Sequence, residues 1–385
     1  MRKLMTAERL WTGARFIDKP AVLIEDHHIQ SITSLLEASA PAADEHLDHA
    51  GCTISPAFFD VHIHGAANHD VMEATPEALA AIGKFLAQRG TGSYFATTVT
   101  APMDATLRAL EGLAKLLSRN SEPAAEARPL GIHLEGPFLS HARRGVHPPE
   151  HLQEPNIALF DRMFEAAGGH VKLITLAPEL PGAVEFARHV IAKGVRVSIG
   201  HSDATAAEAA PVIAAGAVSA THAFNAMRPL NHREPSILST VLSCDSLFAE
   251  LICDGVHVAP EIVRIWWRMK GAKRGILITD AISATGMPNG MYKLGGFDVH
   301  VADGVATANG VLAGSVLTLD RALENFLQFT GAELDDALKM LTANPAAMAG
   351  MEEKTARLAT GSPANLVVVN PHGKRIAGMQ NGIKL

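Results

Sequence analysis

The chain has 385 residues, of which 48% are hydrophobic and 19% charged, enough apolar material for a large core. This composition excludes the disordered and fibrous classes. The formal charge is −7 and no run of Lys or Arg exceeds two residues, which argues against nucleic-acid binding through a basic face. No apolar stretch approaches the ~18 residues that a membrane span needs. The three cysteines lack close metal-type spacing and suit a reducing cytoplasm.

The two ends of the chain carry short strand patterns separated by turn residues. Such pieces occur at Leu10–Phe16, Ala21–Ile24 and Ile29–Thr33, and Ala364–Val369 forms another close to the C-terminus. Neither end is long enough to form a stable sheet alone. We therefore predict that residues 1–55 and 355–385 together form one small β-sandwich domain.

The middle of the chain, residues 56–354, alternates apolar strand patterns with helical ones. Eight strands are predicted at Ala57–Ile63, Ser93–Val99, Leu130–Leu134, Val171–Leu176, Val195–Ile199, Val218–Thr221, Leu247–Cys253 and Gly275–Thr279. Helices are predicted between them at Thr75–Gln88, Asp104–Leu117, Pro181–Ala192, Ala204–Ala215 and Pro260–Met269. Eight β–α units predict an α/β fold of the TIM-barrel, (β/α)8, type. The competing doubly wound sheet usually has a Gly-rich loop after its first strand, whereas histidines follow here.

A long Gly-rich segment, Ser283–Ser315, follows the eighth predicted strand. We expect it to contain a β excursion at Phe297–Val301 and a substrate loop at Val311–Ser315. Segments of this length at a barrel mouth are usually either functional or disordered.

Six of the eight predicted strands end in a possible metal ligand or acid/base group. The active site of a TIM barrel lies at the C-terminal ends of its strands, so these side chains should meet there. They are His62 and His64, Glu135, His201, His222, the pair Asp254 and His257, and Asp280.

Each of these groups also has an ordinary explanation. One His-x-His pair is expected by chance among 19 histidines. Glu135 could be a salt-bridge partner, and Asp280 could cap a helix. Packing explains the whole set less well, because imidazoles and carboxylates at one barrel mouth suit Zn²⁺ or another first-row divalent metal.

Such a cluster supports hydrolysis. A bound metal lowers the pKa of its water towards ~7 and polarises a carbonyl group. A neighbouring carboxylate can accept the proton and return it to the leaving group, and Asp280 is the candidate for that role.

The sequence resembles the amidohydrolase superfamily, and within it the deacetylases of N-acetylated amino-sugar phosphates, along nearly its whole length. The resemblance is carried by residues 56–65, PAFFDVHIHG, and by 131–138, GIHLEGPF. It continues through IGHSDA at 199–204, THAFNAM at 221–227, REP at 233–235, DGVH at 254–257 and TDA at 279–281. The Glu-Gly-Pro-Phe and His-x-x-Asn-Ala-Met strings are specific to the deacetylases, whereas His-x-His is shared across the superfamily.

The resemblance implies one metal held by Glu135, His201 and His222. It allows a second metal, because His62 and His64 are both present. It further implies that Asp280 is the general base and acid, and that His147 polarises the acetyl carbonyl. Zn²⁺ is the first expectation, with Fe²⁺, Co²⁺ or Mn²⁺ as alternatives.

The resemblance also implies a substrate site and an assembly. The expected substrate-binding residues are Val146, His147, Asn225, Ala226, Arg233, His257, Leu312, Ala313 and Gly314. His257 and Arg233 would hold the sugar phosphate, with Arg233 reaching into the neighbouring subunit's site of a homodimer.

The implied reaction removes the N-acetyl group of N-acetyl-D-glucosamine 6-phosphate, giving D-glucosamine 6-phosphate and acetate. Three alternatives stay open at this point. They are deacetylation of the galactosamine epimer, deformylation of a related amino sugar, and a barrel that serves as a non-catalytic scaffold.

Overall fold

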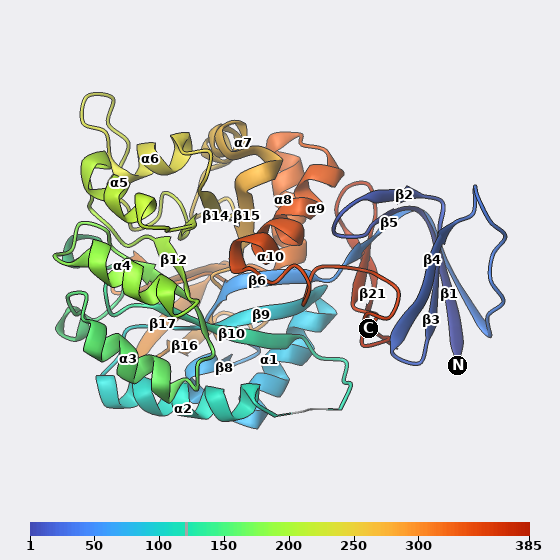
Figure 1. Ribbon diagram of the computed structural model, residues 1–385, viewed down its shortest axis with the longest axis horizontal. Coiled ribbons are helices and arrows are strands. Elements are labelled where there is room, and N and C mark those ends of the chain that lie inside the picture. Colours follow the sequence, from blue (N-terminus) through green and yellow to red (C-terminus); the bar gives the residue numbers. More distant parts are fainter. Residues whose placement is uncertain (120–121) are drawn as a thin grey trace.

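Eight parallel strands form the larger part of the structure, a computed structural model that describes residues 1–119 and 122–385 (Figure 1). They follow one another around a barrel in chain order, which confirms the predicted (β/α)8 architecture. The strands are β6 (Phe58–Ile63), β9 (Thr91–Thr98), β10 (Arg128–Glu135), β11 (Val171–Leu176), β12 (Arg196–Ile199), β13 (Ser219–Ala220), β14 (Phe248–Ile252) and β15 (Gly275–Ile278).

The first and last strands meet just beyond β15, where the barrel closes. The backbone N–H of Asp280 donates to the His62 carbonyl over 2.9 Å, and Ile63 forms a parallel bridge with Ala281. The Thr279 hydroxyl also donates to the Asp60 carboxylate over 2.6 Å. Because of this closure, the ends of β6 and β15 present their side chains at one place.

Helices cover the outside of the barrel and bury their apolar faces against it (Figure 1). Their first turns are fixed by polar side chains, for example Thr75, Asn156 and Thr205, each of which accepts a backbone N–H. The helices are α1 (Pro76–Gln88), α2 (Met103–Leu117), α3 (Ile157–Ala166), α4 (Ala183–Ala192), α5 (Ala206–Ala214), α6 (Ile237–Ser243), α7 (Pro260–Arg274), α8 (Leu319–Thr330), α9 (Leu334–Leu341) and α10 (Ala343–Ala349).

Strands from both chain ends share a second sheet beside the barrel, which confirms the predicted small β domain (Figure 1). Its hydrogen-bonded order is β22-β21-β20-β5-β1-β3-β4, with β2 beside β1. The strands are β1 (Arg2–Trp11), β2 (Phe16–Asp18), β3 (Pro20–Glu25), β4 (His28–Ser34), β5 (Glu45–Pro56), β20 (Leu366–Val369), β21 (Arg375–Gln380) and β22 (Ile383–Lys384). The domain limits at 55/56 and 354/355 stay a prediction.

The predicted strand Leu10–Phe16 is wrong. Strand β1 begins at Arg2 and ends at Trp11, and the chain then turns before β2. Gly13 adopts φ +94°, and the Thr12 hydroxyl accepts the Arg15 N–H over 3.0 Å. A positive φ and a side chain bonded to its own backbone favour a turn over a strand.

A four-stranded antiparallel meander follows β15, where the sequence predicted a single β excursion. Asp70 anchors it to the loop after β6 by accepting the Gly295 N–H over 2.7 Å. The meander comprises β16 (Gly290–Leu294), β17 (Phe297–Ala302), β18 (Val305–Ala308) and β19 (Val311–Leu312), and the loop after β6 contains β7 (Gly65–Ala66) and β8 (His69–Asp70).

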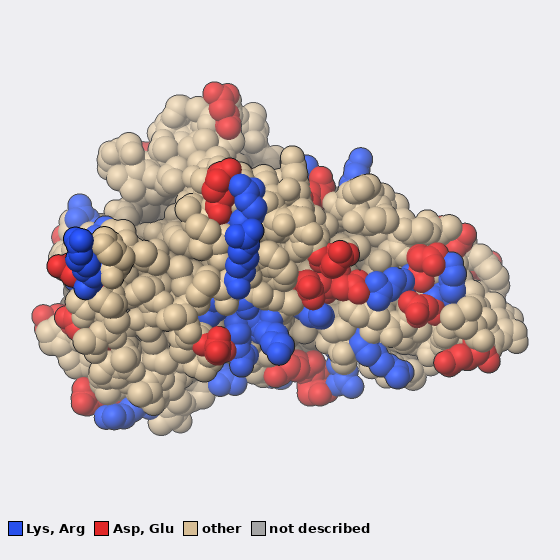
Figure 2. Space-filling view, turned by 90° about the horizontal axis from the view of Figure 1, so that it is seen from above, with Lys and Arg blue, Asp and Glu red and all other residues tan. Residues whose placement is uncertain are grey.

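The surface carries charges of both signs. Figure 2 shows one face, on which a small group of Lys and Arg side chains near the centre is flanked by Asp and Glu. Uncharged residues cover most of that face. Among residues 1–119 and 122–385, no helix has the length and apolar character needed to cross a membrane.

Replacing Thr279 by Val should weaken the closure of the barrel. Thr279→Val keeps the side-chain shape but removes a donor from Asp60, whose carboxylate is fully buried. We expect the free energy of unfolding to fall by about 1–3 kcal/mol, as measured by urea denaturation. Thr279→Ser keeps the hydroxyl, so its free energy of unfolding should fall less. A Val variant as stable as the parent would contradict this account of closure.

Candidate metal centre and active site

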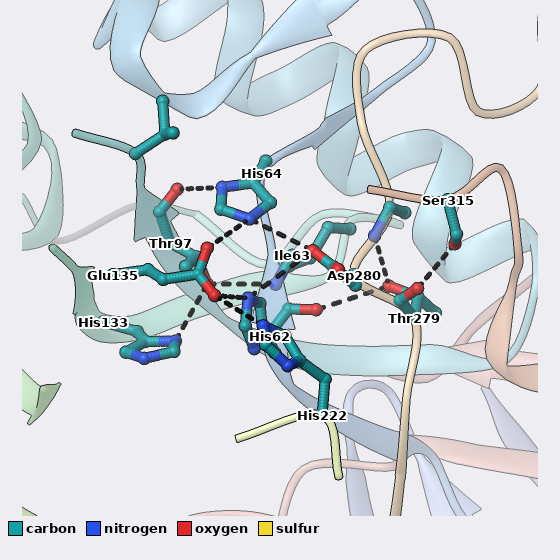
Figure 3. A network of polar contacts seen from close by, with 12 residues as sticks. His62, Ile63, His64, Thr97, His133, Glu135, His222, Thr279, Asp280 and Ser315 are labelled. Carbon is teal, nitrogen blue, oxygen red and sulfur yellow. Dashed lines mark hydrogen bonds and ion pairs between the residues drawn. The ribbon is translucent and has the colours of Figure 1, made fainter. Parts of the chain in front are cut away.

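The C-terminal ends of the barrel strands bring six candidate ligands together at one mouth, and Figure 3 shows five of them, all but His201. One lies on β6 and one directly follows it, one ends β10, and the others lie two residues beyond β12, β13 and β15. All six are buried, at 8% exposure or less. They are His62, His64, Glu135, His201, His222 and Asp280.

The Glu135 carboxylate lies at the centre of this cluster. Its Oε1 is 3.0 Å from His222 Nε2 and 3.3 Å from both His201 Nε2 and His62 Nε2. Its Oε2 is 3.2 Å from His64 Nε2. Glu135 therefore belongs to two overlapping groups, one with His201 and His222 and one on the side of β6.

Asp280 completes the group on the side of β6. Its Oδ1 lies 3.1 Å from His64 Nε2 and 3.5 Å from His62 Nε2. His62, His64, Glu135 and Asp280 each offer one ligand atom, and these atoms all lie within 4.8 Å of one another, close enough to hold one metal ion. We call these four residues the β6-side group, and Glu135, His201 and His222 the β12-side group.

The orientation of the rings fits a cation in the cluster. His64 Nδ1 lies 3.0 Å from the Thr97 carbonyl, and His201 Nδ1 lies 2.9 Å from the Arg143 carbonyl. A carbonyl can only accept, so each Nδ1 carries the hydrogen, and in the neutral ring Nε2 turns a lone pair towards carboxylate oxygens. Acceptors that face acceptors need a positive charge between them, and His N–H groups bonded to carbonyls are typical of metal ligands.

The pKa values of the cluster also indicate a site for a cation. Burial lowers the pKa of His64, but hydrogen bonds to Asp280 and Glu135 outweigh it and raise that pKa to about 9. Burial raises the pKa of Asp280, but His62 and His64 bring it down to about 2. The carboxylates are thus ionised and attract a proton where a metal ion would fit.

Three of the candidate ligands have an uncommon backbone conformation. His201, His222 and Asp280 have φ values of +46°, +29° and +52°, in the left-handed region. Non-glycine residues adopt this region at a cost of order 1–3 kcal/mol and often do so at functional sites. Here each of them is the residue at which a barrel strand gives way to a loop.

His147 is oriented to donate a hydrogen bond into the site. Its Nδ1 is 2.8 Å from the Thr100 hydroxyl and accepts the Thr100 backbone N–H over 3.3 Å. A backbone N–H cannot accept, so the neutral ring carries its hydrogen on Nε2. That nitrogen lies 3.6 Å from Glu135 Oε2.

A pocket of about 370 Å³ opens above the cluster. Seven of the nine predicted substrate-binding residues line it, while Ala313 packs behind it in the core of the meander. The seven are Val146, His147, Asn225, Ala226, His257, Leu312 and Gly314. Gly314 has φ +58°, and a Cβ there would lie 2.9 Å from the Asp280 carbonyl, so only glycine lets the loop approach the site so closely.

Arg233 lies outside this pocket within one chain. It is exposed on the segment between β13 and α6, where its backbone N–H donates to Asn231 Oδ1 over 2.9 Å. The predicted contact across a subunit interface stays a prediction. Arg143 also lines the pocket, and its Nε donates to Asp203 Oδ1 over 2.7 Å.

His257 is held in the pocket by Asp254. Its Nδ1 lies 2.6 Å from Asp254 Oδ2. Burial lowers the pKa of His257, but this carboxylate more than compensates and raises it above its usual value. The ring therefore stays charged to a higher pH than a free imidazole does, which suits an anionic partner.

The sequence reasoning missed the residues that orient the ligands. Glu250, at the centre of β14, contacts His62 and is fully buried. A Glu inside the apolar run Leu-Phe-Ala-Glu-Leu-Ile-Cys was the available signal. For Thr97 and Thr100 the sequence offers none, since threonine is common in strands.

The amidohydrolase family profile matches residues 53–383, and the chain belongs to this family. It is 39% identical to the N-acetylglucosamine-6-phosphate deacetylase of Lysinibacillus sphaericus over 91% of this chain and 89% of that protein. It is 35% identical to the N-acetylgalactosamine-6-phosphate deacetylase of Escherichia coli O157:H7, over 96% of each chain.

The fold is also similar to solved structures of such enzymes. An N-acetyl-D-glucosamine-6-phosphate deacetylase variant from Mycobacterium smegmatis, in complex with N-acetyl-D-glucosamine-6-phosphate, is 33% identical with a TM-score of 0.91. The match covers 100% of this chain and 99% of that one. The enzyme from Pasteurella multocida matches with the same TM-score at 27% identity, over the whole of both chains.

Metal binding at the β6-side group should strengthen as the pH rises. The proton on His64, with a pKa of about 9, must leave before Nε2 can bind a cation. Glu135 and Asp280 also raise the pKa of His62 well above its usual value despite its burial, so up to two protons leave this group. We expect its Zn²⁺ affinity to rise about tenfold to a hundredfold per pH unit up to about pH 9. Burial lowers the pKa of His201 to about 4, so its ring stays neutral over that range and adds no such slope to the β12-side group.

Chelator competition at a series of pH values measures both affinities. His64→Asn removes one of the two titrating rings and should make the slope of the β6-side group shallower by about one proton. Equal slopes for both groups in the parent would contradict the protonation assigned to His64.

Proposed function

We propose that the protein hydrolyses the N-acetyl group of N-acetyl-D-glucosamine 6-phosphate, giving D-glucosamine 6-phosphate and acetate. The observation that carries the proposal is the Glu135-centred cluster of imidazoles and carboxylates at the floor of a 370 Å³ pocket. The deacetylases to which the chain is similar over nearly its full length supply the substrate class.

One or two divalent metal ions are the cofactors in this proposal. Glu135, His201 and His222 would hold the first ion, and His62, His64 and Asp280 could hold a second together with Glu135. Zn²⁺ suits these ligands best, and Fe²⁺, Co²⁺ and Mn²⁺ are compatible with them. When bound, such an ion lowers the pKa of a water molecule and polarises a carbonyl group.

Asp280 moves the proton in this scheme. Its carboxylate is ionised at neutral pH because His62 and His64 hold its pKa low. It can accept a proton from water as the acetyl carbon is attacked. It then returns that proton to the sugar nitrogen, which leaves poorly unless it is protonated.

Other pocket residues would bind and orient the amide. His147 presents Nε2–H to the acetyl carbonyl oxygen, and the Thr100 N–H fixes that tautomer. His257, whose pKa Asp254 raises above its usual value, faces the sugar phosphate. Asn225 and the backbone around Ala226 and Gly314 form the remaining polar walls.

A galactosamine 6-phosphate derivative is the second candidate substrate. It is favoured by the similarity to an N-acetylgalactosamine-6-phosphate deacetylase, which extends over 96% of the chain. The two sugars differ only at one hydroxyl, so the same metal cluster would serve both. Deformylation needs less room than deacetylation and would use the same groups. A scaffold without activity is disfavoured, because all the ligands and Asp280 are present.

The proposal includes a homodimer in which Arg233 reaches the phosphate of the neighbouring site. Its exposure outside the pocket of its own chain is compatible with that role. A cytoplasmic location is proposed on chemical grounds, since Cys52, Cys244 and Cys253 are all free thiols.

Release of acetate from both epimers, assayed with the zinc-loaded protein, tests the proposed function. We expect turnover of at least one epimer, and Asp280→Asn should reduce kcat by about 10²–10⁴-fold because an amide cannot accept the proton. Zinc content must be measured in parallel, since lost metal would imitate a lost base. A zinc-loaded Asn variant within about tenfold of the parent would show that the proton goes elsewhere.

Arg233→Ala should mainly raise KM for the phosphorylated sugar and leave kcat less affected. A guanidinium fork matches a phosphate carrying nearly two charges, and this contact exists before and after the reaction. Steady-state kinetics on phosphorylated and unphosphorylated sugars measure the effect, with Arg144→Ala as a control in another exposed loop. An Arg233→Ala protein that still prefers the phosphorylated sugar as strongly as the parent would exclude this role.

A further inference from the structure

Glu250 is a fully buried carboxylate that the reaction scheme above does not use. It lies on β14, inside the barrel and beneath the metal cluster. Its Oε2 is 3.3 Å from His62 Nδ1 and also accepts the backbone N–H of His222 over 3.3 Å. Its Oε1 has no hydrogen-bond partner among the described residues.

A buried carboxylate with one oxygen unpartnered is unfavourable for stability alone. No Lys or Arg forms an ion pair with it among the described residues, and His62 is its one ion-pair partner there. Because the buried carboxylate of Glu250 lacks a full set of hydrogen-bond partners, it lowers the stability of the fold, and its presence needs another explanation. The contacts of Oε2 give that explanation, because both are made with candidate metal ligands.

The contact with His62 sets which ring nitrogen faces the site. Because the carboxylate accepts, His62 Nδ1 carries the hydrogen, and in the neutral ring that a metal ion requires, Nε2 directs a lone pair towards Glu135 and Asp280. His62 Nε2 is itself buried and has no hydrogen-bond partner in the described chain. A negative charge behind the ring also makes it a stronger ligand.

The contact with His222 acts on the other ligand group. His222 has φ +29°, and its N–H points to Glu250 Oε2 at the point where β13 ends. This hydrogen bond helps to hold an unfavourable backbone conformation that directs Nε2 at Glu135. One oxygen atom thus supports a ligand from each group.

We propose that Glu250 is a positioning residue that prepares both ligand groups for two neighbouring divalent cations. It fixes the tautomer of His62 in the β6-side group and the backbone of His222 in the β12-side group. The inference rests on the proposed function only in requiring that the cluster binds metal.

Zinc titration of the full chain and two variants tests the proposal. Glu250→Gln keeps a carbonyl oxygen for both hydrogen bonds and loses only the charge, so the affinity of the weaker Zn²⁺ site should fall about tenfold. Glu250→Leu removes the acceptor as well and should lower it about a hundredfold, with a smaller loss at the tighter site. Zinc content after dialysis and chelator competition give the two affinities without any substrate.

Ser219→Ala is the matched control. Ser219 is fully buried on the neighbouring strand β13, and its hydroxyl has no partner within the described chain. The variant should bind zinc as the parent does. Thermal unfolding of each metal-free variant separates a loss of fold from a loss of metal affinity.

The outcomes are distinct. Glu250→Leu protein that is less stable but binds two zinc ions as tightly as the parent would overturn the proposal and leave Glu250 a purely structural role. If the Leu variant does not fold, the Gln variant decides, and parental affinity at the weaker site overturns the proposal. A parent that binds no zinc overturns the proposed function itself.

Discussion

Glu135 ends the third barrel strand with both carboxylate oxygens turned towards imidazole nitrogens, at a place from which water is largely excluded. Taking such a charge out of water is unfavourable unless positive charge surrounds it. The surrounding histidines answer this requirement and hold the pKa of Glu135 well below its usual value, although burial alone would raise it. The other ligands are arranged around this one group.

Three of the histidine rings around Glu135 are oriented by hydrogen-bond acceptors behind them. The carbonyls of Thr97 and Arg143 receive Nδ1–H from His64 and His201, and Glu250 receives it from His62. All of these acceptors lie on rigid strands or on the loop that carries His147. The orientation of these rings therefore depends on two backbone carbonyls and one carboxylate outside the set of candidate ligands.

The meander after β15 shapes the pocket above the cluster. Asp70 ties it to the loop after β6, and Leu294, Val311 and Leu312 contribute to the pocket wall. The close approach at Gly314 brings this wall against Asp280. The meander therefore narrows the open mouth of the barrel to a pocket that fits a small polar molecule.

The sequence alone predicted the barrel, which the structure confirms, and the candidate ligands, which the structure brings to one mouth. The alternation of apolar strands and helices predicted the eight strands, and the polar residues at strand ends, such as His201 and His222, were readable because a parallel barrel gathers those ends. The prediction of a strand at Leu10–Phe16 was wrong because a local turn at Gly13 interrupts the apolar pattern. Contacts such as Glu250 with His62 join residues 188 positions apart and leave no local pattern. Only the tertiary structure decides ring orientation, burial and the pocket wall, because these depend on which distant backbone groups the closed barrel brings within hydrogen-bonding distance.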